Sequence, residues 1–234
     1  MLKTKVLDTF TFRDRLIYLK NYHVDRTFEA YQLNFPYVNR TQIESIYDTL
    51  ESSLRLDVNS KQLVRLLFNG DDQCSFSYEI NFLKDHKLPM SLELIDTLKN
   101  PSGRGPQNFK WVERDHWMAL MSARRWSSDD ILAQNVRGQI TEASRFNIFI
   151  YDSKNNIVIT PTLESGCING VYRRFALNQK TIDLGDLGKK NLIEKDILAT
   201  ELLSNPNNYK LFLANSVRGV LSACLNLKNR PPMN

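Results

Sequence analysis

Apolar and polar residues alternate along several short segments of this chain, and such alternation is typical of strands that bury one face. In the first half of the chain, the predicted strands cover residues 6–12, 62–69, 75–82 and 90–96. Apolar positions near helical spacing predict a helix over residues 23–34. A second helix is predicted from Thr41 to about Leu54, with Thr41 as its N-cap and Glu44 three residues later. The first half therefore predicts a small sheet accompanied by two helices.

The second half of the chain is richer in short apolar runs. Its predicted strands cover residues 131–135, 146–152, 156–161, 210–216 and 220–227. Helices are predicted over residues 110–122, 170–178 and 192–203. The whole chain is thus predicted to belong to the α+β class, with mainly antiparallel sheets.

One stretch in the middle of the chain is rich in residues that interrupt helices and strands. Residues 99–107, KNPSGRGPQ, contain two prolines, two glycines, a serine and an asparagine. The pair Gly103 and Gly105 is too short for a phosphate-binding loop and lacks the strand–turn–helix context that such a loop needs. We therefore predict an interdomain loop at residues 99–107, between a small N-terminal domain (1–98) and a C-terminal domain (108–234).

Composition narrows the classes of protein to which the chain can belong. It has 234 residues, of which 42% are hydrophobic and 24% charged, and this excludes wholesale disorder, a collagen-like chain and a long coiled coil. The three cysteines form no CxxC pair and the three histidines are scattered, so we expect a reduced, cytoplasmic protein without a metal site. No apolar run reaches the roughly 18 residues of a membrane span, and the start of the chain has no apolar region of signal-peptide length.

The net charge of the chain is weakly positive. Lysine and arginine total 31 against 26 aspartates and glutamates, which gives a net charge of +5 spread along the chain. This excess suits an anionic small molecule as well as it suits a nucleic acid. The three tryptophans are expected to pack in the core or in a dimer interface rather than to stack on bases. We therefore expect a small-molecule ligand, and neither nucleic acid nor membrane as a partner.

Four stretches combine residue types that can carry chemistry. They are FKWVER (109–114), ITEASRFNIFI (140–150), TPTLESGCINGVYRR (160–174) and FLANSVRGV (212–220). Taken singly each is a weak signal, because a lone lysine or glutamate is usually solvated and a lone glycine usually marks a turn. The order and spacing of the four stretches carry the information.

In this order and spacing, the four stretches resemble the class IV aminotransferase family, the fold-type IV pyridoxal phosphate enzymes. In that family a lysine precedes a V/I-T-E-x-x-x-x-N-I/L strand motif; here Lys110 lies 32 positions before Glu142, and Asn147 follows. A T-P-x-L-x-x-G-x-x-x-G-V/I-x-R stretch is matched by residues 160–173. An N-S-L-R-G-V-like stretch is matched by residues 215–220.

The N-terminal part of the chain adds to the resemblance. Residues 7–26 are similar to the family's E-T-F/M-R-V stretch and the H-x-x-R-L that follows it, which makes Arg26 the counterpart of a phosphate-binding arginine. The resemblance implies a two-domain fold-type IV enzyme, with a small N-terminal α/β sandwich and a C-terminal mixed α/β pseudo-barrel. The strand that precedes this stretch in the family is expected to be missing, and with it part of the active-site wall.

The resemblance also implies pyridoxal 5'-phosphate as the cofactor. Lys110 would hold it as a Schiff base and act as the catalytic base after release, because lysine is the side chain that supplies an amine. Glu142 would keep the pyridine nitrogen protonated, and Arg26 would bind the phosphate together with the start of the helix at Gly170. The other cofactor-binding residues implied are Asn147, Val171, Tyr172 and Ser216.

An anionic amine is the substrate that the resemblance implies, and a homodimer is the assembly. Arg218 and Arg104 are the residues that we expect at the substrate's carboxylates. Arg104 is included because it lies in the loop before Lys110, and such a loop can close over a bound ligand.

Within the family, the expected activity is that of a 4-amino-4-deoxychorismate lyase of folate biosynthesis. Arg114, four residues after the lysine, and the stretch Cys167–Gly170 resemble the lyase branch. An aminotransferase of the branched-chain or D-amino-acid type would use the same motif residues, so this alternative stays open. A catalytically degraded relative is a further alternative, because Glu113 and Asp115 depart from the family's pattern.

Overall fold

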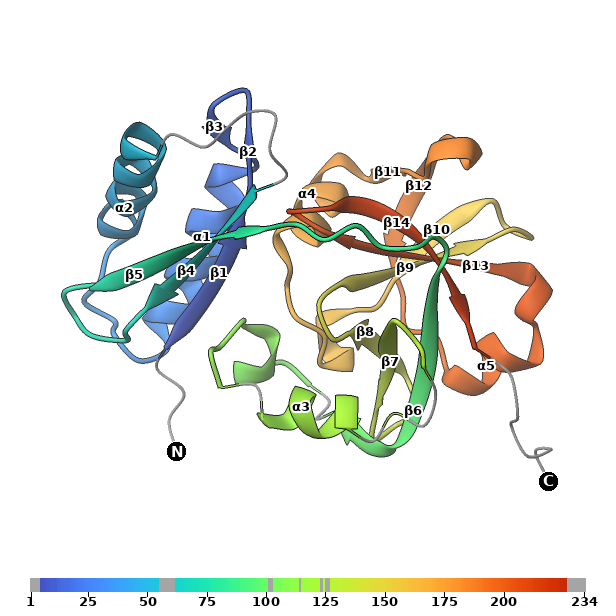
Figure 1. Ribbon diagram of the computed structural model, residues 1–234. Coiled ribbons are helices and arrows are strands. Elements are labelled where there is room, and N and C mark those ends of the chain that lie inside the picture. Colours follow the sequence, from blue (N-terminus) through green and yellow to red (C-terminus); the bar gives the residue numbers. More distant parts are fainter. Residues whose placement is uncertain are drawn as a thin grey trace.

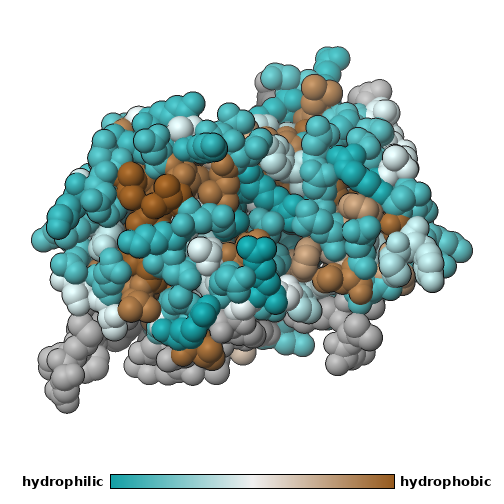
Figure 2. All heavy atoms as spheres, turned by 180° about the vertical axis from the view of Figure 1, so that it is seen from behind, coloured by the Kyte–Doolittle hydropathy of each residue, from teal (hydrophilic) through white to brown (hydrophobic). Residues whose placement is uncertain are grey.

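In the computed structural model, the chain forms a smaller and a larger sheet that lie side by side (Figure 1). No helix among the described residues is long and apolar enough to cross a membrane. The face seen in Figure 2 is mostly hydrophilic, with its hydrophobic side chains gathered in patches. The structure describes residues 5–54, 62–100, 103–113, 115–122, 124 and 127–226.

The N-terminal elements form the smaller unit. They are β1 (Val6–Phe10), β2 (Phe12–Arg13), β3 (Leu16–Ile17), α1 (Lys20–Gln32), α2 (Arg40–Ser53), β4 (Gln62–Phe68) and β5 (Phe76–Phe82). β1, β4 and β5 pair in that order and antiparallel, while β2 and β3 form a separate hairpin. Alternate residues of β4, namely Val64, Leu66 and Phe68, are completely buried in one core with residues of both helices. The period of two along β4 therefore gives the sheet one face that the helices cover.

Helix α2 begins at Arg40 because a different residue from the predicted Thr41 caps it. The Asn39 side chain accepts a hydrogen bond from the Gln42 N–H (3.0 Å), and the Gln42 side chain accepts one from the Asn39 N–H (2.8 Å). Thr41 instead donates its hydroxyl to Asn39 (2.6 Å). A reciprocal capping box satisfies two backbone donors, so it is favoured over a cap at Thr41.

The larger sheet closes into a ring. Its ring strands are β6 (Met90–Asn100), β7 (Asp130–Asn135), β8 (Ile140–Ala143), β9 (Asn147–Asp152), β13 (Tyr209–Asn215) and β14 (Gly219–Leu225). They follow one another in the order β9-β13-β14-β6-β7-β8, and β8 returns to β9 through the pair Glu142–Asn147. Apolar side chains from all six strands pack in one cluster. The closure of the ring thus places two predicted site residues next to each other.

The remaining elements cover the ring or extend from it. Outside the ring, β9 continues the sheet through β10 (Ile157–Thr160), β12 (Lys189–Glu194) and β11 (Thr181–Asp183). Helix α4 (Val171–Gln179) packs on this extension, where Ala176 lies in one core with Phe149 and Val158. The shorter helices are α3 (Asp115–Ser122), α5 (Ala199–Ser204), η1 (Pro106–Asn108), η2 (Leu163–Ser165), η3 (Gly185–Leu187) and η4 (Pro206–Asn208).

Several elements differ from those predicted, for physical reasons. Only the second part of the helix predicted over 192–203 forms. Leu192 lies in β12, which pairs with β10, and the helix begins at Ala199. The strands pair mainly antiparallel, as predicted, but β6 runs parallel to both of its neighbours and β10 runs parallel to β12. The helix predicted over 110–122 begins at Asp115, because the residues before it pair with β1. Tertiary pairing overrides local propensity in these segments.

The chain passes from one sheet to the other between β5 and β6. The sequence places the boundary at residues 99–107, but residues 90–98 lie in β6, which is a ring strand of the larger sheet. An apolar strand pattern does not reveal which sheet the strand joins, so the Gly- and Pro-rich stretch is the stronger signal in the sequence. The predicted architecture of a small N-terminal α/β unit and a C-terminal barrel-like sheet is confirmed.

Helices α1 and α4 hold the two units together. The Arg174 guanidinium donates two hydrogen bonds to the Glu29 carboxylate, both at 2.6 Å. Asn178 donates to the Tyr22 hydroxyl (2.9 Å). A two-point arginine–carboxylate contact fixes orientation as well as distance, so the helices set how the smaller sheet lies against the ring.

Replacing a buried residue of a ring strand is expected to lower the free energy of unfolding far more than replacing an exposed residue of the same sheet. Ile148 on β9 is completely buried, whereas Ile193 on β12 is 40% exposed. We expect Ile148→Ala to lower the free energy of unfolding by about 2–5 kcal/mol, through lost burial and a residual cavity. Ile193→Ala should lower it by less than about 1.5 kcal/mol. Urea unfolding followed by circular dichroism measures both, and equal losses would contradict a closed core.

Candidate active site

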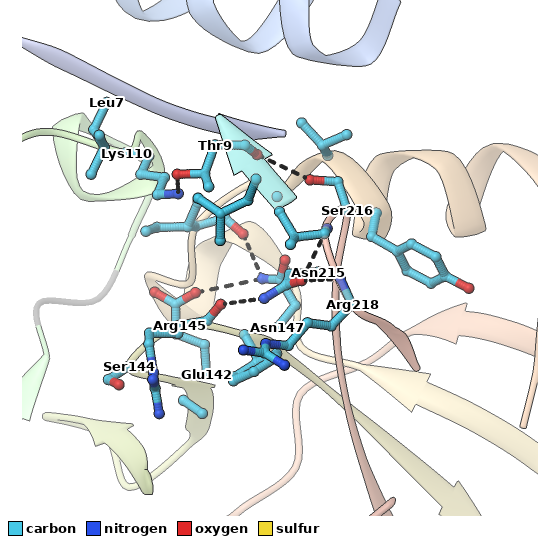
Figure 3. A pocket seen from close by; sticks show the side chains of 18 of the residues that line it. Leu7, Thr9, Lys110, Glu142, Ser144, Arg145, Asn147, Asn215, Ser216 and Arg218 are labelled. Atoms are coloured by element: carbon cyan, nitrogen blue, oxygen red, sulfur yellow. Dashed lines mark hydrogen bonds between the residues drawn. The ribbon is translucent and has the colours of Figure 1, made fainter. Parts of the chain in front are cut away.

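A cavity of about 360 Å³ lies between the two units (Figure 3). Its walls come from β1 and β4 of the smaller sheet, and from β8, β9, the start of α4 and the β13–β14 turn of the larger one. Nine of the ten site residues predicted from the sequence line it: Arg26, Lys110, Glu142, Asn147, Gly170, Val171, Tyr172, Ser216 and Arg218.

Lys110 lies on the edge of the smaller sheet. The Leu7 N–H donates to the Lys110 carbonyl (2.9 Å), and Val6 and Trp111 form an isolated antiparallel bridge. The chain around Lys110 therefore runs along β1 like a short added strand. Its side chain enters the cavity, where Nζ donates a hydrogen bond to Thr9 Oγ1 (3.0 Å).

The alternation of β1 puts a carboxylate directly behind the cavity. Thr9 lines the cavity, whereas its neighbour Asp8 points into the core of the smaller unit and is completely buried. Asp8 lies 2.7 Å from Nδ1 of His23, accepts a hydrogen bond from the Tyr47 hydroxyl (2.5 Å) and pairs with the Arg26 guanidinium. Arg26 also lines the cavity and is 7% exposed. Asp8 therefore anchors the cation that the sequence assigns to the phosphate.

The surroundings of Asp8 keep it ionised. Burial would raise the pKa of Asp8, but His23, the Arg26 guanidinium and the hydrogen bond from His23 together hold that pKa well below its ordinary value. Burial lowers the pKa of His23 against the opposing effect of the Asp8 carboxylate, to which its Nδ1–H donates. The positive charge of Lys110 also lowers the pKa of Asp8. One buried carboxylate thus balances two cations that face the cavity.

Glu142 faces the cavity from β8. It is 4% exposed, and Nδ2 of Asn147 lies 3.5 Å from its carboxylate. The same Asn147 nitrogen donates to the carbonyl of Ile168 (2.8 Å), in the loop before α4. The pair that closes the ring therefore also positions this loop.

The N-terminus of α4 opens onto the cavity. Gly170 is its N-cap and Val171 its first residue, and both line the cavity. The first N–H groups of a helix have no acceptor within the helix, and the positive end of the helix dipole favours an anion. A Cβ on Gly170 would lie 2.0 Å from Oδ1 of Asn147. Only glycine allows Asn147 and the helix start to approach this closely.

Asn108 ties the lysine segment to the loop before α4. Its Nδ2 donates to the carbonyls of Cys167 (2.7 Å) and Leu163 (3.1 Å), and its own carbonyl accepts from the Asn169 N–H (2.9 Å). Asn108 is 5% exposed and lies two positions before Lys110. Its role has no signal in the sequence, because an asparagine beside glycine and proline is ordinarily a turn residue.

The turn between β13 and β14 supplies Ser216 and Arg218. Oδ1 of Asn215 accepts a hydrogen bond from the Arg218 N–H (2.8 Å), and Gly219 takes the left-handed backbone conformation that closes the turn. Ser216 is 6% exposed and donates its hydroxyl to the Thr9 carbonyl (3.4 Å). The turn of the larger sheet thus touches β1 of the smaller sheet across the cavity.

Two predicted residues have surroundings that differ from those of the others. Tyr172 lines the cavity, but its ring packs edge-on against Phe149 (6.5 Å between centroids) and Phe175 (5.9 Å). Burial raises the pKa of Tyr172, so the phenol stays neutral. Arg104 does not line the cavity: its side chain is 70% exposed and pairs with Glu164 (3.0 Å). A part for Arg104 in substrate binding stays a prediction.

The cavity is strongly positive. Among the described residues that line it, five have basic side chains and Glu142 alone has a carboxylate. The basic residues are Arg26, Arg65, Lys110, Arg145 and Arg218. Such an imbalance favours an anionic ligand. Arg65 and Arg145 are not predicted from the sequence, because a lone arginine on a strand or in a turn belongs to no motif.

The donors around the cavity fit pyridoxal phosphate. Lys110 offers an amine for the aldehyde, Glu142 a buried carboxylate for the ring nitrogen, and Arg26 with the start of α4 an anion site for the phosphate. The bare backbone at Gly170 lets an anion approach the helix end. All three kinds of donor open onto one cavity, so a single ligand can reach them together.

Comparison with known proteins shows similarity over most of the chain. The family model "Amino-transferase class IV" matches residues 5–225. A Schizosaccharomyces pombe protein described as a "putative aminodeoxychorismate lyase" is 33% identical over 184 residues, which span 75% of this chain and 73% of that protein.

Two solved structures share the fold. One is a "putative amino-acid aminotransferase" from Mesorhizobium loti, with a TM-score of 0.73 at 20% identity over 94% of this chain and 99% of that one. The other is 4-amino-4-deoxychorismate lyase from Pseudomonas aeruginosa, with a TM-score of 0.70 at 14% identity over 95% and 83% of the two chains. At these identities the structural likeness is one of fold.

Removing the buried carboxylate is expected to destabilise the protein in a pH-dependent way. Asp8→Asn leaves Arg26 without its partner, so we expect a loss of about 3–5 kcal/mol in the free energy of unfolding at pH 7. The pKa of Asp8 is lower in the folded protein than in the unfolded chain. Its contribution to stability is therefore present above pH ~4 and is lost as the pH falls below that value. Wild type should lose stability more steeply than Asp8→Asn on acidification below pH ~4.

Chemical unfolding at a series of pH values measures this difference. Asp48→Asn is the matched control, because Asp48 is 56% exposed and pairs with Lys20 on the surface. It should change the free energy of unfolding by less than about 1 kcal/mol. An acid dependence that is the same in wild type and in Asp8→Asn would contradict the assignment.

Adding a methyl group at Gly170 is expected to weaken cofactor binding. The new Cβ would collide with Asn147, which its bond to the Ile168 carbonyl holds in place. We expect Gly170→Ala to bind pyridoxal phosphate at least about tenfold more weakly. The new methyl group overpacks this region, so the start of α4 must move away from Asn147, and the anion site at its N–H groups moves with it. Absorbance titration with the cofactor measures this. Gly105→Ala is the control, because its Cβ would meet only the end of the flexible Gln107 side chain (2.8 Å), and equal weakening in both variants would refute the role of Gly170.

Proposed function

Because this chain belongs to the class IV aminotransferase family, whose members depend on pyridoxal phosphate, we propose that it is a lyase that converts 4-amino-4-deoxychorismate to 4-aminobenzoate and pyruvate. The observation that carries the proposal is that Lys110, Glu142 and Arg26 line one strongly positive cavity. The Schizosaccharomyces pombe relative, 33% identical to this chain, has this activity in its name and supports the choice within the family.

In this proposal the cofactor is held at both ends. The Lys110 amine would bind it covalently, and Glu142 would keep its pyridine nitrogen protonated. Arg26, the backbone of Gly170 and Val171, and the Ser216 hydroxyl hold the phosphate. When bound, pyridoxal phosphate supplies a ring that withdraws electrons from the carbon next to the substrate amine.

Lys110 then acts as the base of the reaction. Once the substrate amine had displaced it from the cofactor, the free amine of Lys110 would take the proton from the amine-bearing carbon of the substrate. Thr9, whose hydroxyl accepts a hydrogen bond from Nζ (3.0 Å), keeps this amine directed into the cavity. The C–O bond between the carbocycle and the enolpyruvyl group would then break, and the released enolpyruvate would take up a proton on its methylene carbon to become pyruvate, which balances the proton that Lys110 removes. The aromatisation of the remaining ring would drive the reaction.

The lining of the cavity suits this substrate in two further ways. Four arginines provide positive charge for a substrate with two carboxylates. Apolar side chains give a flat carbocyclic ring a surface to pack on. The larger apolar side chains among them include Leu7, Leu63, Leu83 and Phe146.

Amino-acid transamination is the second candidate activity. It would use the same lysine to return the proton to the cofactor, so the residues of the cavity serve both reactions. The family match and the fold shared with aminotransferases favour it equally. Pyruvate released from 4-amino-4-deoxychorismate supports the lyase. Amination of the cofactor by an amino acid, without such pyruvate, would replace the lyase by an aminotransferase.

The covalent role of Lys110 can be tested by trapping the cofactor. The protein is saturated with pyridoxal phosphate, reduced with borohydride, digested and mapped by mass spectrometry. We expect the adduct on the peptide that contains Lys110, and no adduct there in Lys110→Ala. Lys110→Ala should also release pyruvate from 4-amino-4-deoxychorismate at least about 10³-fold more slowly, because base and nucleophile are lost together.

Lys190→Ala serves as the control for this experiment. Lys190 lies on β12, with Nζ 5.6 Å from the centre of the Tyr151 ring, and does not line the cavity. It should keep both the adduct and the activity. An adduct on another lysine would assign the Schiff base to that lysine. A colourless protein that takes up no pyridoxal phosphate would instead indicate that this chain is a catalytically degraded relative of the family.

A further inference from the structure

Two of the arginines in the cavity, Arg145 and Arg218, have so far entered only through their charge, without a defined binding geometry. Arg145 lies in the turn between β8 and β9, and Arg218 lies in the β13–β14 turn. Both line the cavity, and in Figure 3 they lie on the opposite side of it from Thr9 and Lys110. They form a second positive group, apart from the cations that Asp8 anchors.

A single side chain fixes the spacing between the two arginines. Nδ2 of Asn215 donates a hydrogen bond to the carbonyl of Arg145 (3.1 Å), while its Oδ1 accepts one from the N–H of Arg218 (2.8 Å). Both backbones are therefore tied to the same amide group. The side chains of Arg145 and Arg218 therefore extend from backbone positions that are fixed relative to each other, as a preorganised binding site requires.

Arg218 is a partly buried cation of the β13–β14 turn, and among the described residues the carboxylate that acts on its charge is that of Asp85. Burial lowers the pKa of Arg218, and the positive charge of Arg145 lowers it further, against a smaller opposing effect of Asp85. Arg145 itself is 50% exposed and only loosely paired, with Nε 3.5 Å from the Asp130 carboxylate. Two neighbouring cations of which one is partly desolvated repel each other, and an anion that joins them removes this repulsion.

We propose that Arg145 and Arg218 together bind a carboxylate of the substrate that is remote from its amine. Two guanidinium groups present planar sets of N–H donors that match the two oxygens of a carboxylate. The negative charge removes the repulsion between them, and the ring of Phe146, next to Arg145, can pack against the body of the ligand. The inference rests on the proposed function only in that the substrate enters this cavity.

The test measures binding rather than turnover, so that it stands apart from the proposed reaction. The probes are 4-hydroxybenzoate and 4-hydroxybenzamide, which have nearly the same shape, differ in charge and carry no aliphatic amine to react with the cofactor. Isothermal titration of the protein saturated with pyridoxal phosphate gives the two dissociation constants. We expect the wild type to prefer the acid over the amide by about tenfold or more, the usual value of a charge-assisted contact.

Variants then locate the carboxylate. Arg145→Met and Arg218→Met should each remove most of this preference, and the double variant should lose little more than either single one, because both arginines hold one carboxylate. Arg218→Gln is the second variant at that position and keeps a polar side chain in the turn. Lys190→Met removes a positive charge outside the cavity and should leave the preference unchanged.

Three outcomes would overturn the inference. The first is a wild type that binds the acid and the amide equally, and the second is a full preference in the arginine variants. The third is a variant that loses affinity for pyridoxal phosphate but keeps the preference, because the pair would then hold the cofactor's phosphate. Loss of the preference in a protein that releases no pyruvate from 4-amino-4-deoxychorismate would instead leave the carboxylate site standing and remove only the lyase.

Discussion

The carboxylate of Asp8 is the interaction on which the rest of the site depends. It is completely buried, yet it meets partners from α1 and α2 and lies one residue from the hydroxyl that holds the Lys110 amine. Buried ion pairs are poor stabilisers compared with apolar residues of the same volume. A core of this size could therefore be built without Asp8. An apolar core could not hold the Arg26 guanidinium in the wall of the cavity. The need to position this guanidinium explains the presence of the buried Asp8 network.

Asparagines position the other side of the cavity. Asn108, Asn147 and Asn215 each use one amide to join two segments that are not paired in a sheet. The first ties the lysine segment to the loop before α4, the second ties Glu142 to the same loop, and the third ties the two arginine-bearing turns. An amide has both donors and an acceptor, so it can replace the missing backbone ladder where loops meet. The relative positions of the catalytic groups thus depend on three side chains that do no chemistry.

The sequence predicts the parts of the site that are local and misses those that arise from the meeting of distant segments. Lys110, Glu142 and Gly170 belong to motifs with a recognisable spacing, and all three line the cavity. The partners of Asp8 come from two helices that lie between 15 and 39 positions away, so no motif contains them together. The pairing of β6 within the ring is missed for the same reason, because a short apolar strand carries no information about its neighbours.

The distribution of charge suggests how ligands and fold support each other. The smaller unit contributes Arg26 and Arg65 to the cavity, and the larger unit contributes Arg145 and Arg218. Like charges on facing walls repel, so this part of the interface opposes the contacts that α1 and α4 make elsewhere. An anion between the walls reverses the sign of that interaction. An anionic cofactor and substrate, as proposed above, would therefore bind best to the arrangement in which the two units are together, and by mass action each would stabilise that arrangement for the other.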